Sequence, residues 1–167
     1  HLVDGAWQVR TVAELPFVHR FDVLATPEKN YLIACTLKSG HEYKEDWTHP
    51  GKIYVAELPE DLLAEDSEIE WAVLAEWLTK NHGYYRCYEN GRPFSLVSAE
   101  NGVFKVMPPS PDQPAWKLEK LLDEACSDGT LLDLDGDGQP ELLTFSPFHG
   151  EVLRIWRLTD GKYQLDY

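Results

Sequence analysis

The sequence predicts an all-β fold built from repeated units of four short strands. Aromatic residues make up 12% of the 167 residues, and large flat side chains are frequent on pleated sheets. Short apolar runs are separated by turn pairs such as Asn90-Gly91 and Asp160-Gly161, a pattern typical of antiparallel strands. A strand led by tryptophan recurs at Trp7, Trp71 and Trp116. The last two are separated by roughly the 40–50 residues that make one blade of a β-propeller.

The repeats divide the chain into three blades and a short leading segment. Within the units, alternation of apolar and polar residues is clear over residues 52–56 and 152–156, where side chains point to opposite faces with a period of two. Residues 1–15 contain the Trp-led run Trp7–Val12, which we expect to be an outer strand of a preceding blade. Residues 1–167 are therefore predicted to form one partial β-propeller domain of about three four-stranded blades plus one extra outer strand. We expect the blades at residues 16–78, 79–122 and 123–167.

Three blades are too few to close a propeller, which typically needs four to eight. An open ring leaves strand edges and apolar faces uncovered. The expected partners are therefore the remaining propeller blades of a longer protein, which we favour, or further copies of the chain.

Composition excludes several functional classes. The net charge of −14 and the pI of about 4.7 disfavour nucleic acid as a partner, because a polyanion is repelled. No apolar run approaches the ~18 residues of a membrane span. Neither a Gly-x-Ser-x-Gly elbow nor a Gly-rich phosphate loop is present, which disfavours a serine hydrolase or a nucleotide-binding protein. Three cysteines without a Cys-x-x-Cys pair predict buried thiols and favour a cytoplasmic location.

The clearest local motif is the acidic stretch from Asp133 to Glu141, Asp-Leu-Asp-Gly-Asp-Gly-Gln-Pro-Glu. Carboxylates at alternate positions with glycines between them suit Ca²⁺, which takes 6–8 oxygen ligands. An EF-hand is excluded because Thr144 stands where its last acidic ligand belongs and the flanks resemble strands. The predicted calcium ligands are the side chains of Asp133, Asp135, Asp137 and Glu141 and the backbone carbonyl of Gln139.

This motif, followed by a strand, resembles the FG-GAP or VCBS repeat of calcium-loaded β-propellers. The resemblance implies a structural calcium ion at the rim of the third blade. The corresponding place in the second blade keeps only residues 89–93 of the pattern, so one calcium loop is expected. Propellers of this kind are often secreted, which is the alternative to a cytoplasmic location.

Histidines occupy equivalent corners of the repeats. Alignment of the units puts His19, His82 and Asp128 at the corner leading into the first strand of each blade, and His149 at a second corner. Because first strands line the channel of a propeller, these side chains are expected to converge. Histidine is the usual acid or base at neutral pH and a common transition-metal ligand. His19, His82 and Asp128 are the predicted ligands of a second divalent metal ion: zinc, manganese or iron.

Aromatic and polar residues beside these corners predict a carbohydrate or another small molecule as the ligand. Trp47, Tyr84 and Tyr85 offer rings on which the C–H face of a sugar can stack. The alternative is that Trp47 covers the insert around it and that Tyr84 or Tyr85 packs in the blade core. The predicted substrate-binding residues are His41, Trp47, Asn81, Tyr85 and Arg20.

The blade plan together with His19, His82 and His149 is similar to the propeller domains of aldos-2-ulose dehydratase and related sugar-processing proteins. The similarity implies β-elimination of water or of a glycosidic oxygen, with a metal ion polarising the substrate oxygen. His82 or His149 would remove the proton α to the carbonyl, and Tyr84 would protonate the leaving oxygen. The predicted catalytic residues are thus His19, His82, His149 and Tyr84. A non-catalytic, calcium-stabilised propeller that binds carbohydrate or protein is the alternative.

Overall fold

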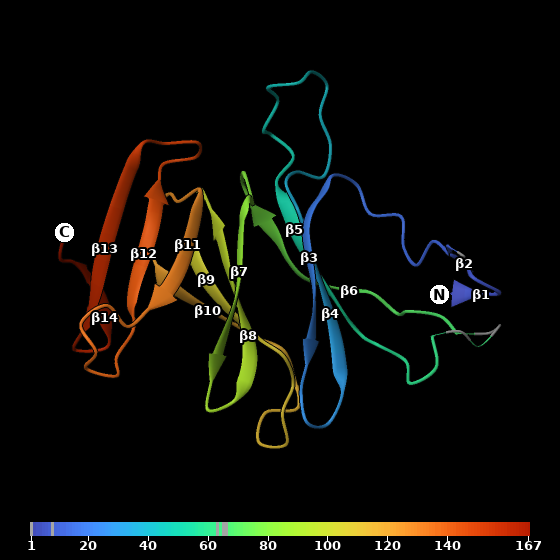
Figure 1. Ribbon diagram of the computed structural model, residues 1–167. Helices are drawn as coiled ribbons and strands as arrows, with labels where there is room; N and C mark the ends of the chain where they lie inside the picture. The colour runs from blue at the N-terminus through green and yellow to red at the C-terminus, as the bar shows by residue number, and fades with distance from the viewer. Residues whose placement is uncertain (1, 8, 63, 65–66) are drawn as a thin grey trace.

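The computed structural model describes residues 2–7, 9–62, 64 and 67–167, and all regular elements in this part of the chain are β-strands (Figure 1). Twelve of these described strands form three four-stranded antiparallel sheets, which confirms the all-β prediction and the four-strand repeat. The first sheet contains β3 (Val18–Ala25), β4 (Asn30–Thr36), β5 (Gly51–Glu57) and β6 (Ala72–Leu78). The second contains β7 (Gly83–Glu89), β8 (Arg92–Ala99), β9 (Gly102–Met107) and β10 (Lys117–Leu122). The third contains β11 (Asp128–Leu132), β12 (Glu141–Ser146), β13 (Val152–Thr159) and β14 (Lys162–Leu165).

Each sheet is a meander in which every strand pairs with the next one along the chain. The turns carry the residues that such hairpins need. Asn90 and Gly91 between β7 and β8 both have positive φ, as do Asp160 and Gly161 between β13 and β14. Two consecutive positive φ angles match the right-handed twist of the flanking strands. Trp71 and Trp116 directly precede β6 and β10, so the recurring tryptophan marks the fourth strand of a sheet.

The prediction of an outer strand over Trp7–Val12 is wrong. The described part of this segment forms β2 (Ala6–Trp7), which pairs with β1 (Leu2–Val3) in a hairpin of its own, and residues 9–15 contain no strand. Asp4 and Gly5 have φ of 47° and 79°, which closes a tight two-residue turn. The chain therefore pairs with itself here and is not added to another sheet.

The second sheet lies between the other two, as their order in Figure 1 shows, and contributes side chains to an apolar cluster on each of its faces. Successive residues of β8 point in opposite directions. Val97 packs into an apolar cluster with Leu24 and Ile33 of the first sheet. Phe94 and Leu96 pack into a second cluster with Leu142 and Trp156 of the third sheet. All three cysteines are buried and free, as the sequence predicted.

The outward faces of the first and third sheets are apolar and exposed. Phe21 and Val73 on the first sheet are 75% and 48% exposed, and Phe145 and Leu153 on the third are 50% and 51% exposed. The described strands of the first sheet do not pair with those of the third. Among the described residues, no helix has the length and apolar character needed to span a membrane.

Candidate functional site

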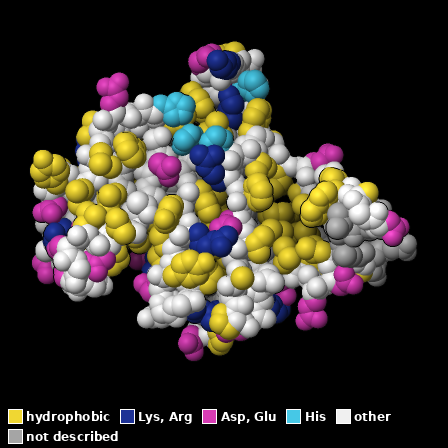
Figure 2. Space-filling model, viewed as in Figure 1, with side chains coloured by type: hydrophobic (Ala, Val, Ile, Leu, Met, Phe, Trp, Pro, Cys, Tyr) yellow, Lys and Arg dark blue, Asp and Glu magenta, His cyan; other side chains and the backbone are white. Residues whose placement is uncertain are grey.

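Histidine side chains from all three sheets gather at one end of the molecule (Figure 2). His19 is the second residue of β3, His82 immediately precedes β7, and His149 lies in the turn between β12 and β13. The ring centroids of His19 and His82 are 4.6 Å apart, and those of His82 and His149 are 5.1 Å apart. We call His19, His82 and His149 the histidine cluster.

The central imidazole of the histidine cluster is fixed by the backbone of the third sheet. His82 Nδ1 lies 3.1 Å from the carbonyl oxygen of Ser127. A carbonyl can only accept, so Nδ1 donates and Nε2 keeps the lone pair of the neutral ring. Gly83 makes this approach feasible, because a Cβ there would lie 2.7 Å from Asp128 Cα and from Ser127 O. The result is an oriented nitrogen suited to act as a base or a metal ligand.

The turn that presents His149 is tightly constrained. Gly150 N donates to the carbonyl of Pro147 at 2.7 Å, and a Cβ on Gly150 would meet Ser146 O at 2.1 Å. His149 itself has a positive φ of 52°, an uncommon conformation for a residue other than glycine. Its ring stacks on Phe148 with a centroid distance of 4.1 Å. Phe148 and the turn at Gly150 therefore hold the His149 ring against the His82 ring.

His19 contributes a nitrogen that has no protein partner. Among the described residues, no group forms a hydrogen bond to its buried Nε2. Burial lowers the pKa of His19, and the positive charge of Arg20 and the neighbouring imidazoles of His82 and His149 lower it further. The imidazole is therefore neutral near neutral pH, as a base or a metal ligand must be.

Aromatic rings and two lysines surround the histidine cluster. The Phe148 ring lies 5.4 Å from His82 and 5.4 Å from Trp47. Lys80 Nζ lies 5.5 Å from the Phe148 ring centroid, and Lys38 Nζ lies 4.9 Å from that of Trp47. Trp47 was predicted, whereas Phe148, Lys38 and Lys80 were missed. For these three residues, the only indication in the sequence was the position of Phe148 directly before His149.

Two predicted residues serve the packing between sheets instead of the site. Asn81 is fully buried and its Nδ2 donates to the carbonyl of Lys52 at 3.2 Å, whereas its Oδ1 has no hydrogen-bond partner among the described residues. The Tyr84 hydroxyl lies 2.8 Å from both Asp22 Oδ2 and Ser95 Oγ. Burial raises the pKa of Tyr84, which makes it a poor donor for a leaving oxygen. Both side chains lie on the inward face of their segment, and for Tyr84 this is the core packing that the sequence offered as the alternative to ligand binding.

Four other predicted residues do not join the histidine cluster. The His41 ring packs on Phe17 at 5.1 Å, and its Nδ1 is 3.1 Å from the carbonyl of Tyr43. Asp128 accepts a hydrogen bond from its neighbour Gly129. Arg20 donates to the carbonyl of His19 at 3.1 Å. Tyr85 is half exposed and lines a cleft between the second and third sheets.

The predicted second metal set is not assembled. Within the described part of the chain, the single group of acidic, histidine or cysteine residues with ligand atoms close enough for one ion is Asp133, Asp135 and Glu141. His19, His82 and Asp128 do not form such a group. In the histidine cluster, the His82 ring contacts both the His19 ring and the His149 ring.

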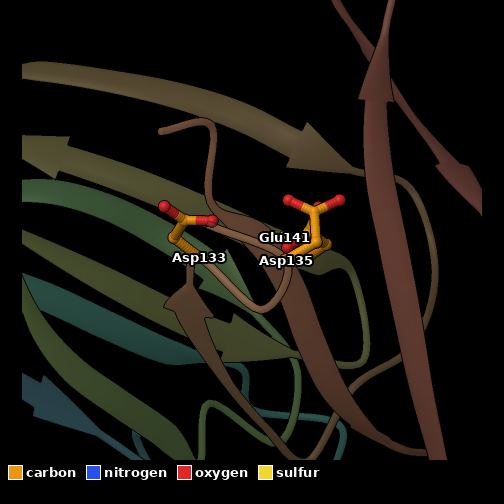
Figure 3. A group of neighbouring side chains, drawn as sticks. All are labelled: Asp133, Asp135 and Glu141. Carbon is orange, nitrogen blue, oxygen red and sulfur yellow. The ribbon is translucent and has the colours of Figure 1, made fainter. Parts of the chain in front are cut away.

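The acidic loop connects β11 to β12, and Figure 3 shows its three gathered carboxylates. Asp133 accepts from the backbone N–H groups of Gly136 and Gly138 at 2.8 and 3.0 Å. Glu141, 3% exposed, accepts from Leu134 N at 2.9 Å. Asp137 is outside this group and accepts from Gln139 N at 2.7 Å.

A guanidinium group sits beside the acidic loop. Arg157 Nη1 lies 2.7 Å from Asp135 Oδ2 and 3.3 Å from Glu141 Oε1. The hydrogen bond from Arg157 lowers the pKa of Asp135. Arg157 therefore supplies the positive charge that this loop needs when it holds no ion.

Comparisons with protein-family models, with curated proteins and with solved structures give no match for this chain.

Proposed function

We propose that this chain is part of a β-propeller that processes a carbohydrate by metal-assisted elimination or isomerisation at the histidine cluster. The observation that carries the proposal is the contact of three imidazoles from three different sheets, with ring centroids 4.6 and 5.1 Å apart. Acid–base chemistry on a sugar needs groups that take up and release protons in one place.

The nitrogens of the histidine cluster fit a metal ion in part. His19 Nε2 is buried without a partner among the described residues, and such an orphaned atom calls for a missing ligand. His82 offers Nε2 because Ser127 holds its Nδ1. A divalent ion held by these two nitrogens would polarise a substrate oxygen. Its remaining ligands would come from the substrate, from water or from parts of the protein outside the described residues.

Within this proposal, one histidine accepts a proton from the substrate and another donates a proton to it. One imidazole of the pair His82 and His149 enters as the free base and removes the proton α to the carbonyl. The electrons of the broken C–H bond form the C=C bond, the C–O bond breaks, and the other imidazole, which enters protonated, gives its proton to the departing oxygen. Trp47 and Phe148 supply rings for the apolar face of the sugar. The engaged hydroxyl of Tyr84 leaves it outside this scheme.

A non-catalytic propeller that binds carbohydrate or protein is the second candidate. The observation in its favour is that His82 Nδ1 forms a hydrogen bond that ties the second sheet to the third. A purely structural histidine would make the same contact.

For the acidic loop, we propose a structural calcium ion held by Asp133, Asp135 and Glu141. Their three oxygens lie within reach of one ion, and carboxylate oxygens are what Ca²⁺ prefers. The exposed apolar faces at Phe21 and Phe145 are proposed to pack against further blades, either from a longer chain or from another copy.

Metal analysis of three proteins tests both metal proposals. The wild type, His82→Ala and Asp135→Asn are stripped with a chelator and reloaded with calcium plus zinc, manganese or iron. We expect the wild type to retain calcium and one transition metal ion, His82→Ala to retain calcium alone, and Asp135→Asn to retain the transition metal. Retention of calcium alone by the wild type would contradict the metal-assisted site.

A product assay tests the chemistry. β-Elimination from a keto sugar yields a conjugated unsaturated carbonyl, which is detected by its ultraviolet absorbance. We expect the reloaded wild type to form this product and His82→Ala to lose about 10²-fold or more of the rate, the usual contribution of a general base. The matched control is His41→Ala, an exposed histidine that packs on Phe17. Equal rates in wild type and His82→Ala would favour the non-catalytic candidate.

A further inference from the structure

The cleft that Tyr85 lines lies between the second and third sheets, away from the histidine cluster. Its volume is about 810 Å³, within the ~300–1,000 Å³ typical of small-molecule sites. The walls come from β7, β8, β9 and β10 on one side and from β11, β13, β14 and residues 138–140 on the other. β7 starts beside His82 and runs toward this cleft, which is lined by residues 85–89 of the strand. Both walls belong to this chain, so the cleft needs no further blade to be complete.

Aromatic rings and free hydroxyl groups line the cleft. Tyr85, Phe94 and Tyr163 belong to its lining, and Tyr85 is 50% exposed. Among the described residues, neither the Tyr85 nor the Tyr163 hydroxyl has a hydrogen-bond partner. Rings that are not fully covered and that carry unused donors combine an apolar surface with hydrogen-bonding capacity.

The charged side chains of the cleft are already neutralised by protein partners. Lys105 Nζ lies 3.0 Å from both carboxylate oxygens of Glu89, and it also lies 4.5 Å from the Phe94 ring centroid. The other charged lining residues are Arg86, Glu119 and Lys120, and they pair with Asp22, Lys117 and Asp123 respectively. Each charged lining side chain thus has a partner of opposite sign, so no unpaired charge among them selects an ionic ligand.

We propose that this cleft binds a neutral carbohydrate, with a pyranose ring stacked on Tyr85 and hydroxyl groups bonded to Tyr85 and Tyr163. A pyranose presents C–H groups on one face and hydroxyls around its rim, which matches partly exposed rings with free phenol groups in a charge-balanced cleft. The site is separate from the histidine cluster and does not depend on the function proposed for it.

Saturation-transfer NMR with neutral methyl hexopyranosides tests the proposal. The probes are methyl β-D-glucopyranoside, methyl α-D-mannopyranoside and methyl β-D-galactopyranoside, with methyl β-D-glucuronide as the charged counterpart. We expect at least one neutral glycoside to bind the wild type, and the glucuronide to bind at least fivefold more weakly than its neutral glucoside. Tyr85→Ser is expected to weaken binding at least fivefold, and Tyr163→Phe, which keeps the ring, about twofold to threefold.

The matched control is Tyr43→Ser, because Tyr43 is an exposed tyrosine in the insert between β4 and β5. This control is expected to bind like the wild type. Absence of binding by every neutral glycoside would overturn the proposal. Binding that survives Tyr85→Ser in a protein with an unchanged melting temperature would overturn it as well.

Discussion

The imidazole rings of His19 and His82 lie 4.6 Å apart between centroids and are tilted by 39°, although they belong to the first and second sheets. Two protonated imidazoles at this distance would repel each other. The contact therefore requires at least one neutral ring, and His19, whose Nε2 is buried, is the one whose pKa is lowered. The pair links the protonation state of the site to the packing of two sheets.

The first prediction concerns the pH dependence of stability. Because burial and the nearby charges lower the pKa of His19 below 6.5, the unfolded chain takes up a proton that the folded protein resists. The free energy of unfolding should therefore fall as the pH drops below about 6.5, and it should be unaffected by His19 above that value. Urea unfolding at about pH 7.5 and about pH 5.5 measures this. His19→Gln should lose less stability between the two pH values than the wild type, and an equal loss would contradict the prediction.

The second prediction concerns the hydrogen bonds and the ion pair that join the first and second sheets. Asp22 on β3 accepts from the Tyr84 hydroxyl at 2.8 Å and from Arg86 Nε at 2.7 Å. Burial alone would raise the pKa of Asp22, but the hydrogen bonds from Arg86 and Tyr84 outweigh it and the net pKa is lowered. Asp22→Asn should cost about 2 kcal/mol, less than the ~3–5 kcal/mol of a fully buried pair, because Arg86 is 40% exposed.

Glu28→Gln is the control for this change, since it breaks the more exposed ion pair with Arg92 and should cost much less. In the wild type, the contribution of Asp22 is present above the pKa of an unfolded aspartate and is lost as the pH falls through its lower folded value. Denaturant unfolding at neutral and acidic pH measures both effects. A similar loss of stability in Asp22→Asn and Glu28→Gln would show that the contacts of Asp22 with Tyr84 and Arg86 contribute little.

The third prediction concerns the close approach of Gly83 to the third sheet. A Cβ at Gly83 would lie 2.7 Å from the backbone of Ser127 and Asp128, so Gly83→Ala must push the sheets apart. We expect a loss of about 2 kcal/mol and a shift of the His82 ring resonances, because the hydrogen bond to Ser127 is strained. Gly40→Ala is the control, since a Cβ there meets His49 at an ordinary 3.5 Å. An unchanged free energy of unfolding in Gly83→Ala would contradict this prediction.

The fourth prediction concerns competition between Arg157 and calcium. Arg157 contacts Asp135 and Glu141, two of the three proposed ligands, so a calcium ion must displace it. Arg157→Gln should therefore bind calcium about tenfold more tightly, a change of ~1.4 kcal/mol, and should have a lower melting temperature without calcium. Titration calorimetry and thermal unfolding with and without calcium measure these effects.

Glu141→Gln is the matched variant for the calcium experiment, because it removes a buried ligand charge and keeps the shape. It should weaken calcium binding strongly. A wild-type protein that takes up no calcium at millimolar concentrations would refute the site itself, whereas equal affinities of wild type and Arg157→Gln would refute only the competition.

Local patterns in the sequence were sufficient for the strands, the turns and the acidic loop. Alternating side chains and pairs such as Asn90-Gly91 act over a few residues, and four-stranded meanders need only neighbouring strands to pair. The same locality explains why Asp133, Asp135 and Glu141 could be grouped in advance, although the prediction also included Asp137 and the carbonyl of Gln139, which are not part of the observed group. It also explains the error at residues 1–15, where Trp7 has the pattern of an outer strand but the Asp4-Gly5 turn pairs it with the preceding residues.

The tertiary structure alone decided which side chains meet. His82 could be placed at a corner from the repeat, but its hydrogen bond to Ser127 depends on how closely the second and third sheets approach. Asn81 was predicted to bind substrate and Tyr84 to act in catalysis. In the structure, Asn81 Nδ2 donates to the carbonyl of Lys52, and the Tyr84 hydroxyl forms hydrogen bonds with Asp22 and Ser95. Backbone pairing depends on short-range pattern, whereas the partner of a side chain depends on packing between segments far apart in the chain.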